Sequence, residues 1–600
     1  MFHPADVSRI QQMVTQITGY CYAGTVSAAR GDRLQVEGGA EAVHIIAPTK
    51  PALARGFLRF FQQLRAGQDR VSLQETARFE SCGCHVDFSR NAVMTVEACK
   101  RFIDRIAALG MNLIVLYTED TYTVPEYPRH GYLRGRLTQA ELRELDEYAA
   151  SLEVELMPCI QTLGHMEQFL QWCDQQHLMD QPEVLLVDEE ETYRLIEAQI
   201  RALRACVRGK RLHIGMDEAH GVGLGQYYAK NGPTDRFALL NRHLQRVVDI
   251  CRRYDFQPIM WSDMFFRLGS KHNEYYDMQA DIPQEVIDRI PGVDMCYWDY
   301  YHDTPEMYEH MLTEHAKMGA STVFAGGIWT WSGFLPQVEK TWATMEPALR
   351  SCAKHGVKTV FATMWGDDGQ ETNHALALSQ APIFSEFCWR GEGCTREEIQ
   401  AVGEFLTGIP KEAYEAFGLF YPGPEDLRPG KALVYCDLLY PLAPEKEALE
   451  ASIERSNRAI AVLEKHAQLQ ECDYALSLFR LIRHKAELLL EIRARYRAGD
   501  KVWMERLVRR EIPALLAEYE ALRLRHKALW ERDHKRNGWE VLALRYGAVK
   551  GRLEDVQESI LRWVSGELPE LCEMEEEPMP TPRKWGSQHY SVHVTPMINL

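Results

Sequence analysis

The sequence of 600 residues has no apolar run long enough to cross a membrane, and it lacks an excess of positive charge. A membrane helix needs roughly 18 consecutive apolar residues. Residues 1–19 do not show the basic start and apolar run of a secretory signal. The net charge of −18 argues against a nucleic-acid surface, which needs clustered lysine and arginine. We therefore expect a cytoplasmic protein that binds neither membrane nor nucleic acid.

The cysteine pattern of a disulfide framework or of a structural metal site is also missing. The fifteen cysteines are an odd number and are scattered, most of them inside apolar runs. A free cysteine in such a run behaves as a small hydrophobic residue. The close pair Cys82 and Cys84 is not accompanied by a second pair at zinc-site spacing. We expect a reduced protein with no metal and no cofactor.

The order of apolar patterns predicts three domains. Residues 1–80 mix short strand-like runs with one helix, which indicates a small α/β domain. Residues 81–390 alternate apolar, β-branched runs with amphipathic helical stretches, eight times in succession. This repetition predicts a (β/α)8 TIM barrel. A doubly wound sheet is the alternative, but no glycine-rich dinucleotide motif follows the first strand.

The strand signal disappears after residue 390. Residues 391–600 predict an all-helical C-terminal domain, with long helices over 445–467, 471–498, 501–530 and 540–565. Trp530, Trp539 and Tyr546 stand among charged residues there, which predicts exposed aromatic rings. Because exposed aromatic residues are common where protein surfaces meet, we expect a homodimer.

Two adjacent acids occupy the most informative stretch, residues 211–225. A short apolar strand, expected to reach as far as Asp217, is followed by Glu218 and a glycine-rich loop. Barrel enzymes keep their chemistry at the carboxyl ends of the strands, so both carboxylates are predicted to reach one pocket. Acid pairs at strand ends are often only solvated, but the neighbouring His213, His220 and glycines favour a site here.

The other strand ends supply further polar and aromatic side chains. We expect them to gather at the same mouth: Arg90, His165, Asp367, Trp261, Trp298, Trp329 and Trp365. Several indoles around one mouth form a cup for the flat, apolar face of a sugar. An ion pair between Arg90 and Asp87 is an equally good interpretation of that arginine.

These motifs resemble glycoside hydrolase family 20, the β-N-acetylhexosaminidases. The sequence His213-Ile-Gly-Met-Asp217-Glu218 is similar to the family motif on strand 4, and Asp87-Phe-Ser-Arg90 to that on strand 1. A Gly-His pair ends at His165, and an acid follows the last of the three strand-end indoles by two residues. The resemblance covers residues 81–390. The three-part outline resembles the intracellular bacterial branch of the family.

The resemblance implies an exo-acting, retaining glycosidase that removes a terminal β-linked N-acetylhexosamine. Asp217 would orient the substrate's acetamide group, and Glu218 would protonate the leaving oxygen. The charge of Asp217 and the indoles predict a raised pKa for Glu218. The family's strand 7 Tyr-x-Asp is missing, because this chain has Trp329-Thr-Trp331 there. Tyr300, just past strand 6, is the substitute that we expect to hold the acetamide oxygen.

Two other classes of protein remain open from the residues alone. His213, Asp217 and His220 are potential ligands of a metal-dependent barrel hydrolase, because imidazole and carboxylate suit zinc or manganese. A non-catalytic sugar-binding protein that has kept the fold is the second alternative, since fold does not imply function. The expected partner is a small carbohydrate. The sequence does not distinguish N-acetylglucosamine from N-acetylgalactosamine.

Overall fold

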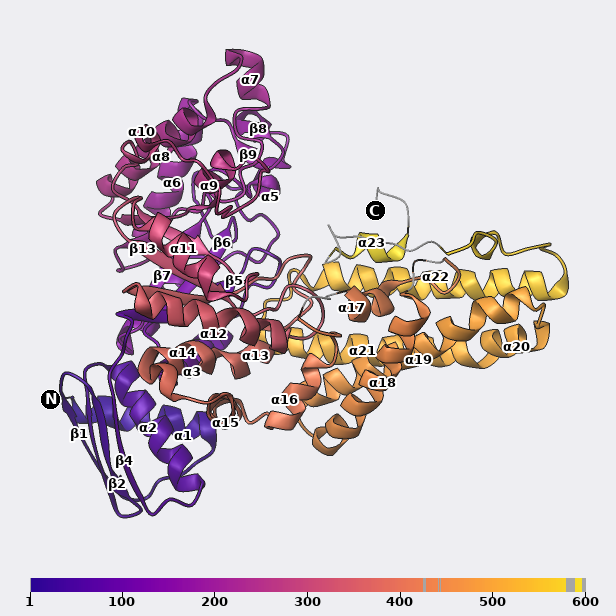
Figure 1. The fold of residues 1–600 in the computed structure, drawn as a ribbon, viewed down its shortest axis with the longest axis horizontal. Coiled ribbons are helices and arrows are strands. Elements are labelled where there is room, and N and C mark those ends of the chain that lie inside the picture. The colour runs from indigo at the N-terminus through magenta and orange to yellow at the C-terminus, as the bar shows by residue number, and fades with distance from the viewer. Residues whose placement is uncertain (1, 425–427, 441, 443, 579–588, 596–600) are drawn as a thin grey trace.

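The computed structural model describes residues 2–424, 428–440, 442, 444–578 and 589–595. Figure 1 shows a small sheet with two helices at the N-terminal end, a barrel above it, and a bundle of long helices that extends to one side. No helix among the described residues is long and apolar enough to span a membrane.

The N-terminal part is a four-stranded sheet packed on helices. The strands follow the order β1-β3-β2-β4, in which β1 and β3 are parallel and the other pairs antiparallel. Helix α2 buries Phe57, Phe60 and Phe61 against the rest of the chain. The elements are α1 (Pro4–Thr18), β1 (Thr25–Arg30), β2 (Leu34–Gly39), β3 (Ala42–Ala47), α2 (Lys50–Arg65) and β4 (Arg70–Glu75).

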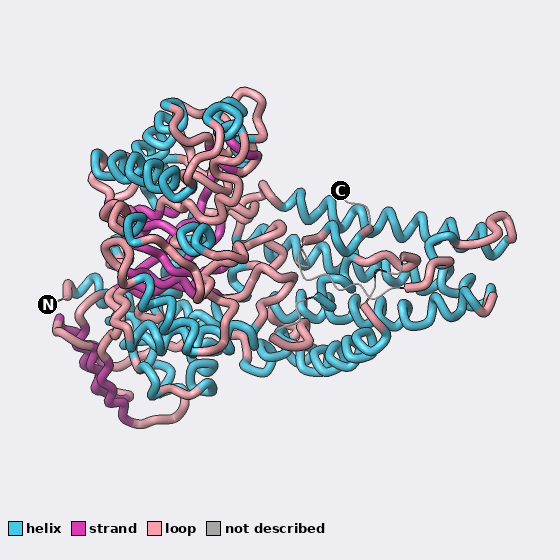
Figure 2. The backbone as a smooth tube through the Cα atoms, turned by 45° about the horizontal axis from the view of Figure 1, so that its top comes forward, coloured by secondary structure: helices cyan, strands magenta, loops and turns pink. Residues whose placement is uncertain are grey.

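Eight parallel strands then close into a barrel, which confirms the predicted (β/α)8 fold. In Figure 2 helices surround the strands of the barrel. Because the strands are parallel, all their carboxyl ends open at one mouth. The strands are β5 (Ser81–Asp87), β6 (Leu113–Glu119), β7 (Glu155–Ile160), β10 (Arg211–His213), β11 (Gln257–Trp261), β12 (Asp294–Trp298), β13 (Thr322–Gly327) and β14 (Thr359–Met364).

The covering helices follow from caps and apolar stripes in the sequence. In α3 (Val96–Ala108) the Thr95 hydroxyl accepts a hydrogen bond from the Ala98 N–H, which begins the helix. Its apolar stripe, which includes Phe102 and Ile106, is buried. The other long barrel helices are α4 (Gln139–Ser151), α6 (Glu190–Arg204), α8 (Arg236–Arg253), α11 (Pro305–His315), α12 (Val338–Lys354) and α14 (Ala381–Trp389).

The strand that precedes the acid pair is shorter than predicted. We expected it to continue to Asp217, but β10 ends at His213. Gly215 and Met216 have left-handed backbones, with φ of 71° and 76°. A side chain on Gly215 would collide with Gln161 Oε1 and with a carbonyl of β7. The backbone therefore leaves the sheet before the acids and turns into the mouth, a change that alternation along a strand does not reveal.

The C-terminal part is helical, as predicted. Its long helices are α18 (Lys446–Leu463), α19 (Gln470–Arg497), α21 (Ile512–Asp533) and α22 (Trp539–Ser565). The expectation of exposed aromatic rings was wrong: Trp530, Trp539 and Tyr546 are buried around His526. These rings stabilise their own helical bundle, so they provide no argument for a homodimer.

Two shorter helices join the barrel to this bundle. Helix α15 (Arg396–Thr407) packs on α14 and on the N-terminal helices, and α16 (Lys411–Gly418) packs on α12 and α18. The division at residue 390 stays a prediction. This boundary separates the barrel, which carries the candidate site, from the helical part. By its contacts, however, α15 belongs to the barrel side.

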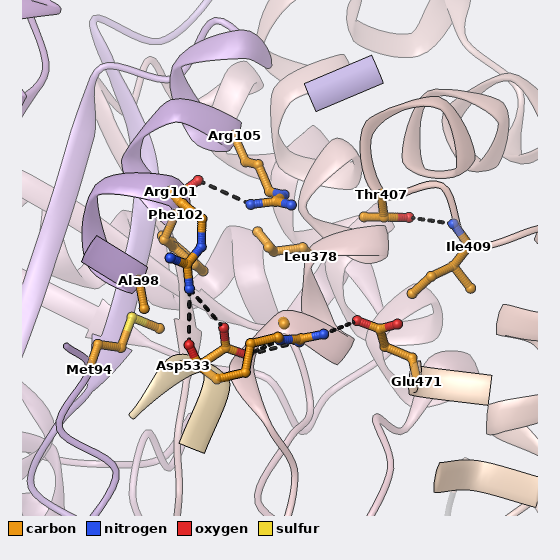
Figure 3. Close-up of a pocket in the computed structure, with 12 residues that line it drawn as sticks. Met94, Ala98, Arg101, Phe102, Arg105, Leu378, Thr407, Ile409, Glu471 and Asp533 are labelled. Carbon is orange, nitrogen blue, oxygen red and sulfur yellow. Dashed lines mark hydrogen bonds and ion pairs between the residues drawn. The ribbon is translucent and has the colours of Figure 1, made fainter. Parts of the chain in front are cut away.

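A cavity lies at the junction of barrel and bundle, and charged side chains line it (Figure 3). The Arg532 guanidinium contacts Glu471 at 2.6 Å and Asp533 at 2.8 Å. Arg101, from α3 of the barrel, approaches the same Asp533 at 3.4 Å. The ion pairs of Arg101 and Arg532 with these acids link the barrel to the bundle, and Arg105, which also lines the cavity, donates to the Arg101 carbonyl.

A second junction, between the N-terminal part and the barrel, depends on one fully buried arginine. Arg55 of α2 contacts Glu75 of β4 and Glu386 of α14, each at 2.6 Å. Burial by itself would raise the pKa of Glu386, but the charge of Arg55 outweighs it and lowers that pKa. These ion pairs stabilise the junction only while all three charged groups are present, because a buried charge that loses its partner is costly.

We predict that Arg55→Met lowers the free energy of unfolding by about 3–5 kcal/mol, because Glu75 and Glu386 lose their nearest cation and keep only the longer contacts with Arg59 at 3.9 Å and Arg390 at 3.6 Å. Arg201→Met is the matched control, since its ion pair with Glu126 is exposed and worth about 0–1 kcal/mol. Urea unfolding followed by tryptophan fluorescence measures both. Equal, small losses in the two variants would contradict the prediction.

Candidate active site

The acid pair lies at the barrel mouth with two different surroundings. The Asp217 side chain is 10% exposed, and its Oδ1 accepts a 2.6 Å hydrogen bond from Gln161 Nε2. The Glu218 side chain is 38% exposed, so it lies nearer the opening. Its backbone N–H donates to Asp263 Oδ2 at 2.9 Å, which holds its left-handed backbone, φ 48°. One carboxylate is thus fixed in the floor, and the other faces incoming molecules.

His165 lies between the two carboxylates. Its Nε2 is 3.3 Å from Asp217 Oδ2 and 3.4 Å from Glu218 Oε2. Its backbone is left-handed, with φ of 51°. Gly164, the residue before it, passes so close to the Asp217 carbonyl that a side chain would collide there. Strand β7 thus delivers the imidazole to both acids, although the two come from a different strand.

The predicted direction of the Glu218 pKa was wrong. Burial raises this pKa, as we expected, but the hydrogen bond and the charge of His165 outweigh it, so the pKa of Glu218 is lowered. The pKa of Asp217 is lowered for the same reason. Burial opposes the charge of His165, yet the two carboxylates raise its pKa well above the usual value. The three groups therefore share their protons as one coupled system.

Indoles line the cavity in front of the acids, and three of them were expected from the strand ends. The cavity is lined by Trp261, Trp298 and Trp365, together with polar groups from the other strand ends. Trp261 is fully buried and lies beneath Trp365, with ring centroids 6.1 Å apart. Flat indole walls combined with charged and hydroxyl groups suit a sugar ring, which has apolar faces and a polar edge.

The β12 and β13 loops complete the wall with stacked aromatic residues. Tyr300 and Trp331 line the cavity, with ring centroids 4.9 Å apart. Trp329, which we expected at the cavity, does not line it: it stacks behind Trp331 at 4.3 Å and donates from Nε1 to the Tyr300 carbonyl. Residues 329–331 lie in the loop after β13, so the path of that loop, and not alternation along a strand, decides which indole faces inward.

Arg90 and Asp367 also line the cavity, near enough to act on each other's pKa. Arg90 does pair with Asp87, at 3.3 Å, and also approaches Glu119 at 3.6 Å. Its guanidinium lies 5.3 Å from the Trp365 ring centroid while the residue still lines the cavity. Burial raises the pKa of Asp367 against the opposing charge of Arg90. Both interpretations of Arg90 therefore hold at once.

The sequence reasoning missed two polar residues that organise the acids. Gln161 donates to Asp217 and to the Tyr117 hydroxyl, and accepts from the Met216 N–H at 3.1 Å. Asp263 accepts from Glu218, as described above. Gln161 directly follows β7 and Asp263 lies two residues after Trp261, so their place at strand ends was the available signal.

The three potential metal ligands do not converge. His213 packs on Trp261 at 4.2 Å, and its Nδ1 accepts from the Gly215 N–H. His220 Nε2 lies 2.7 Å from the Tyr275 hydroxyl. Asp217 is held by Gln161 and His165. Among the described residues, no group of three histidine, cysteine or acidic side chains is placed to hold a metal ion.

The loop that carries Asp367 is held from outside by the helical part. Asp368, the next residue, contacts Lys431 of α17 (Arg428–Tyr435) at 2.7 Å and Arg545 of α22 at 2.9 Å. The same two cations bind Glu371, at 2.7 and 3.0 Å. The end of β14 is thereby fixed to the helical bundle.

A closed parallel barrel with an acid pair and indoles at its mouth defines a TIM-barrel protein with a sugar-sized site. Residues 79–288 match the description "glycosyl hydrolase family 20, catalytic domain", and residues 421–593 match "glycoside hydrolase 20C C-terminal domain". Together the two matches span more than half of the chain. The chain belongs to glycoside hydrolase family 20.

Two curated relatives are similar to part of the chain. Hexosaminidase D of Bos taurus is 29% identical over 231 residues, which cover 36% of this chain and 63% of the relative. Hexosaminidase D of Homo sapiens is 26% identical over 233 residues, which cover 36% of this chain and 44% of the relative. The alignments thus span less than two thirds of either relative.

Solved structures share the fold. A Vibrio harveyi exo-β-N-acetylglucosaminidase, solved with N-acetylglucosamine, has a TM-score of 0.50 at 14% identity, covering 69% of this chain and 73% of that chain. A Flavobacterium johnsoniae chitobiase has a TM-score of 0.50 at 13% identity, covering 92% of this chain and 93% of that chain.

We predict that Trp365→Ala lowers kcat/KM on an aryl N-acetylglucosaminide by on the order of 100-fold, because an indole wall buries a large aromatic area. Trp503→Ala is the control, since Trp503 lies in α20 (Lys501–Arg506) outside the cavity. A chromogenic assay, with melting curves to verify folding, measures both. Activity within about threefold of the parent in Trp365→Ala would remove this indole from the site.

Proposed function

We propose that this protein is an exo-acting β-N-acetylhexosaminidase that releases a terminal β-linked N-acetylhexosamine. The observation that carries the proposal is the pair Asp217–Glu218 bridged by His165 in front of four indoles. Adjacent residues cannot place two carboxyl groups on opposite faces of a sugar, as ordinary retaining enzymes do. A reaction in which the substrate supplies the nucleophile needs both acids on one side.

In the proposed first step, the acetamide oxygen of the substrate attacks the anomeric carbon and the bond to the leaving oxygen breaks. Glu218 gives its proton to that oxygen, and Asp217 accepts a hydrogen bond from the acetamide N–H, which orients the group. In the second step Glu218 takes a proton from water, the water oxygen bonds to the anomeric carbon, and the oxazoline ring opens. Configuration is retained.

In this scheme His165 is the source of the proton that Glu218 donates. Glu218 is the more exposed acid but has a lowered pKa beside His165. A proton on His165 can pass across 3.4 Å to Glu218 before the bond breaks. A leaving group that enters the mouth displaces water and strengthens this coupling, because charges interact more strongly in a dry site.

The remaining lining residues are proposed to bind the sugar. Arg90 and Asp367 lie together, so their natural targets are hydroxyl groups on the ring edge far from the acetamide. Tyr300 is proposed to hold the acetamide oxygen; its hydroxyl stays neutral, since burial raises its pKa well above 10. Which epimer at C4 is preferred depends on Arg90 and Asp367, and assays of both aryl glycosides test it.

The first experiment is turnover of p-nitrophenyl N-acetyl-β-glucosaminide and its galacto epimer by the full chain. Release of nitrophenol with both or either substrate supports the proposal. Binding without turnover would leave a sugar-binding protein instead. Activity abolished by exhaustive chelation would favour the metal-dependent class.

We predict that the two acid variants fail differently. Glu218→Gln cannot donate a proton, so it should lose about 10²–10⁴-fold on substrates with poor leaving groups and much less on an acidic phenol. Asp217→Asn weakens the attack itself, so leaving-group acidity should rescue little. The measurement is kcat/KM over a series of aryl glycosides of different leaving-group pKa.

Added azide separates the roles further. It should restore turnover of Glu218→Gln on good leaving groups, because a nucleophile that needs no base can replace water. Asp217→Asn should not respond. The same leaving-group dependence in both variants would require the assignment of Asp217 and Glu218 to be withdrawn.

A further inference from the structure

A tyrosine outside the cavity lining interacts with Glu218. Tyr275 belongs to the segment between α9 (Asp263–Gly269) and α10 (Gln284–Ile287). Its ring packs on Trp298, with centroids 5.3 Å apart. Burial and then the nearby Glu218 carboxylate raise the pKa of Tyr275, so its hydroxyl stays protonated. Nothing in the reaction scheme above uses this group.

His220 fixes the Tyr275 hydroxyl. The His220 backbone N–H donates to the Glu218 carbonyl at 2.6 Å, so both residues belong to the same short turn. Its Nε2 lies 2.7 Å from Tyr275 Oη, with the two rings 5.6 Å apart. Burial and then Arg267 lower the pKa of His220, which keeps the imidazole neutral. A neutral ring with its proton on Nε2 donates to Tyr275 and leaves the tyrosine proton for Glu218.

The segment on both sides of Tyr275 is anchored, which gives the hydroxyl a defined place. The neighbouring Tyr276 is buried, and its hydroxyl lies 3.2 Å from Ser262 Oγ and accepts from the Trp298 N–H. Ser270 Oγ donates to Asp277 Oδ2 at 2.8 Å. Arg267 lies 5.1 Å from the Tyr275 ring centroid.

We propose that Tyr275, held by His220, is a positioning residue for Glu218: its hydroxyl donates a hydrogen bond that aims the carboxyl group at the leaving oxygen. The inference rests on the function proposed above. Two groups then hold the Glu218 carboxyl group. His165, which follows β7, is a cation, and Tyr275, in the segment after β11, is a neutral donor. The neutral donor holds the carboxyl group without adding charge at the entrance for the leaving group.

Several other ionisable groups interact electrostatically with Glu218, so a test of Tyr275 must leave them unchanged. They are His165, Asp217, His220, Asp263, Asp367, Glu183, Tyr300 and Tyr301. Of these groups, His220 is the one that loses a hydrogen bond when the Tyr275 hydroxyl alone is removed. A change that follows removal of that hydroxyl therefore reports on Tyr275, His220 and Glu218.

The test compares Tyr275→Phe, which keeps the ring on Trp298, with Tyr228→Phe, a tyrosine that is 50% exposed on α7 (Gln226–Asn231). In Tyr275→Phe we expect kcat/KM on a poor leaving group to fall about tenfold, with little change on an acidic phenol. Loss of a donor to the carboxylate raises the Glu218 pKa, so the alkaline limb of the kcat/KM profile should move up by about one pH unit. Tyr228→Phe should change neither.

His220 variants test the link between the two residues. His220→Leu removes the donor and should reproduce Tyr275→Phe, whereas His220→Gln keeps an N–H and should recover part of the loss. The double variant of His220→Leu with Tyr275→Phe should lose no more than either alone, because both act through one contact. Melting curves verify that each variant folds.

The outcomes separate the two proposals. No turnover by the parent protein would overturn the proposed function and this inference with it. An active parent whose Tyr275→Phe variant keeps its pH profile and its leaving-group dependence would overturn the inference alone. A uniform loss on all substrates without a pH shift would likewise overturn it, because that result indicates only packing against Trp298.

Discussion

The charge of His165 is the interaction on which the site depends. Two carboxylates on consecutive residues repel each other, and burial penalises both, so the pair needs a cation within reach. His165 provides it from a neighbouring strand, 3.3 and 3.4 Å from the two acids. The backbone accepts left-handed conformations at His165, Met216 and Glu218 to bring these groups together. Hydrogen bonds from the Met216 N–H to Gln161 and from the Glu218 N–H to Asp263 stabilise that geometry.

The barrel mouth is also braced from outside its own strands. Lys431 and Arg545 of the helical part bind Asp368, next to Asp367 of the cavity. The turn between α21 and α22 touches another rim loop, where the Lys535 N–H donates to the Val93 carbonyl. The helical part therefore contacts the rim at the ends of the first and last strands. Its place in the molecule explains why long helices accompany this barrel.

Much of the fold could be predicted because its signals are local. The βα alternation repeats eight times, and the stripe of α3 appears at helical spacing with its threonine cap. The candidate site followed from one rule, that parallel strands bring their carboxyl ends together, and Arg90, His165 and Trp365 do line one cavity. Gln161 and Asp263 stand at the same strand ends but carry no motif, so their roles became visible only through their partners.

The sequence by itself determined the alternation of elements, the order of the strands and the supply of acids and indoles at their ends, because periodicity and turn residues are properties of neighbouring positions. Tertiary structure alone decided that β10 ends at His213, that Trp331 rather than Trp329 faces the cavity, and that the pKa of Glu218 is lowered. Each depends on groups distant in the sequence. Electrostatics and packing act through space, and a linear pattern does not contain those distances.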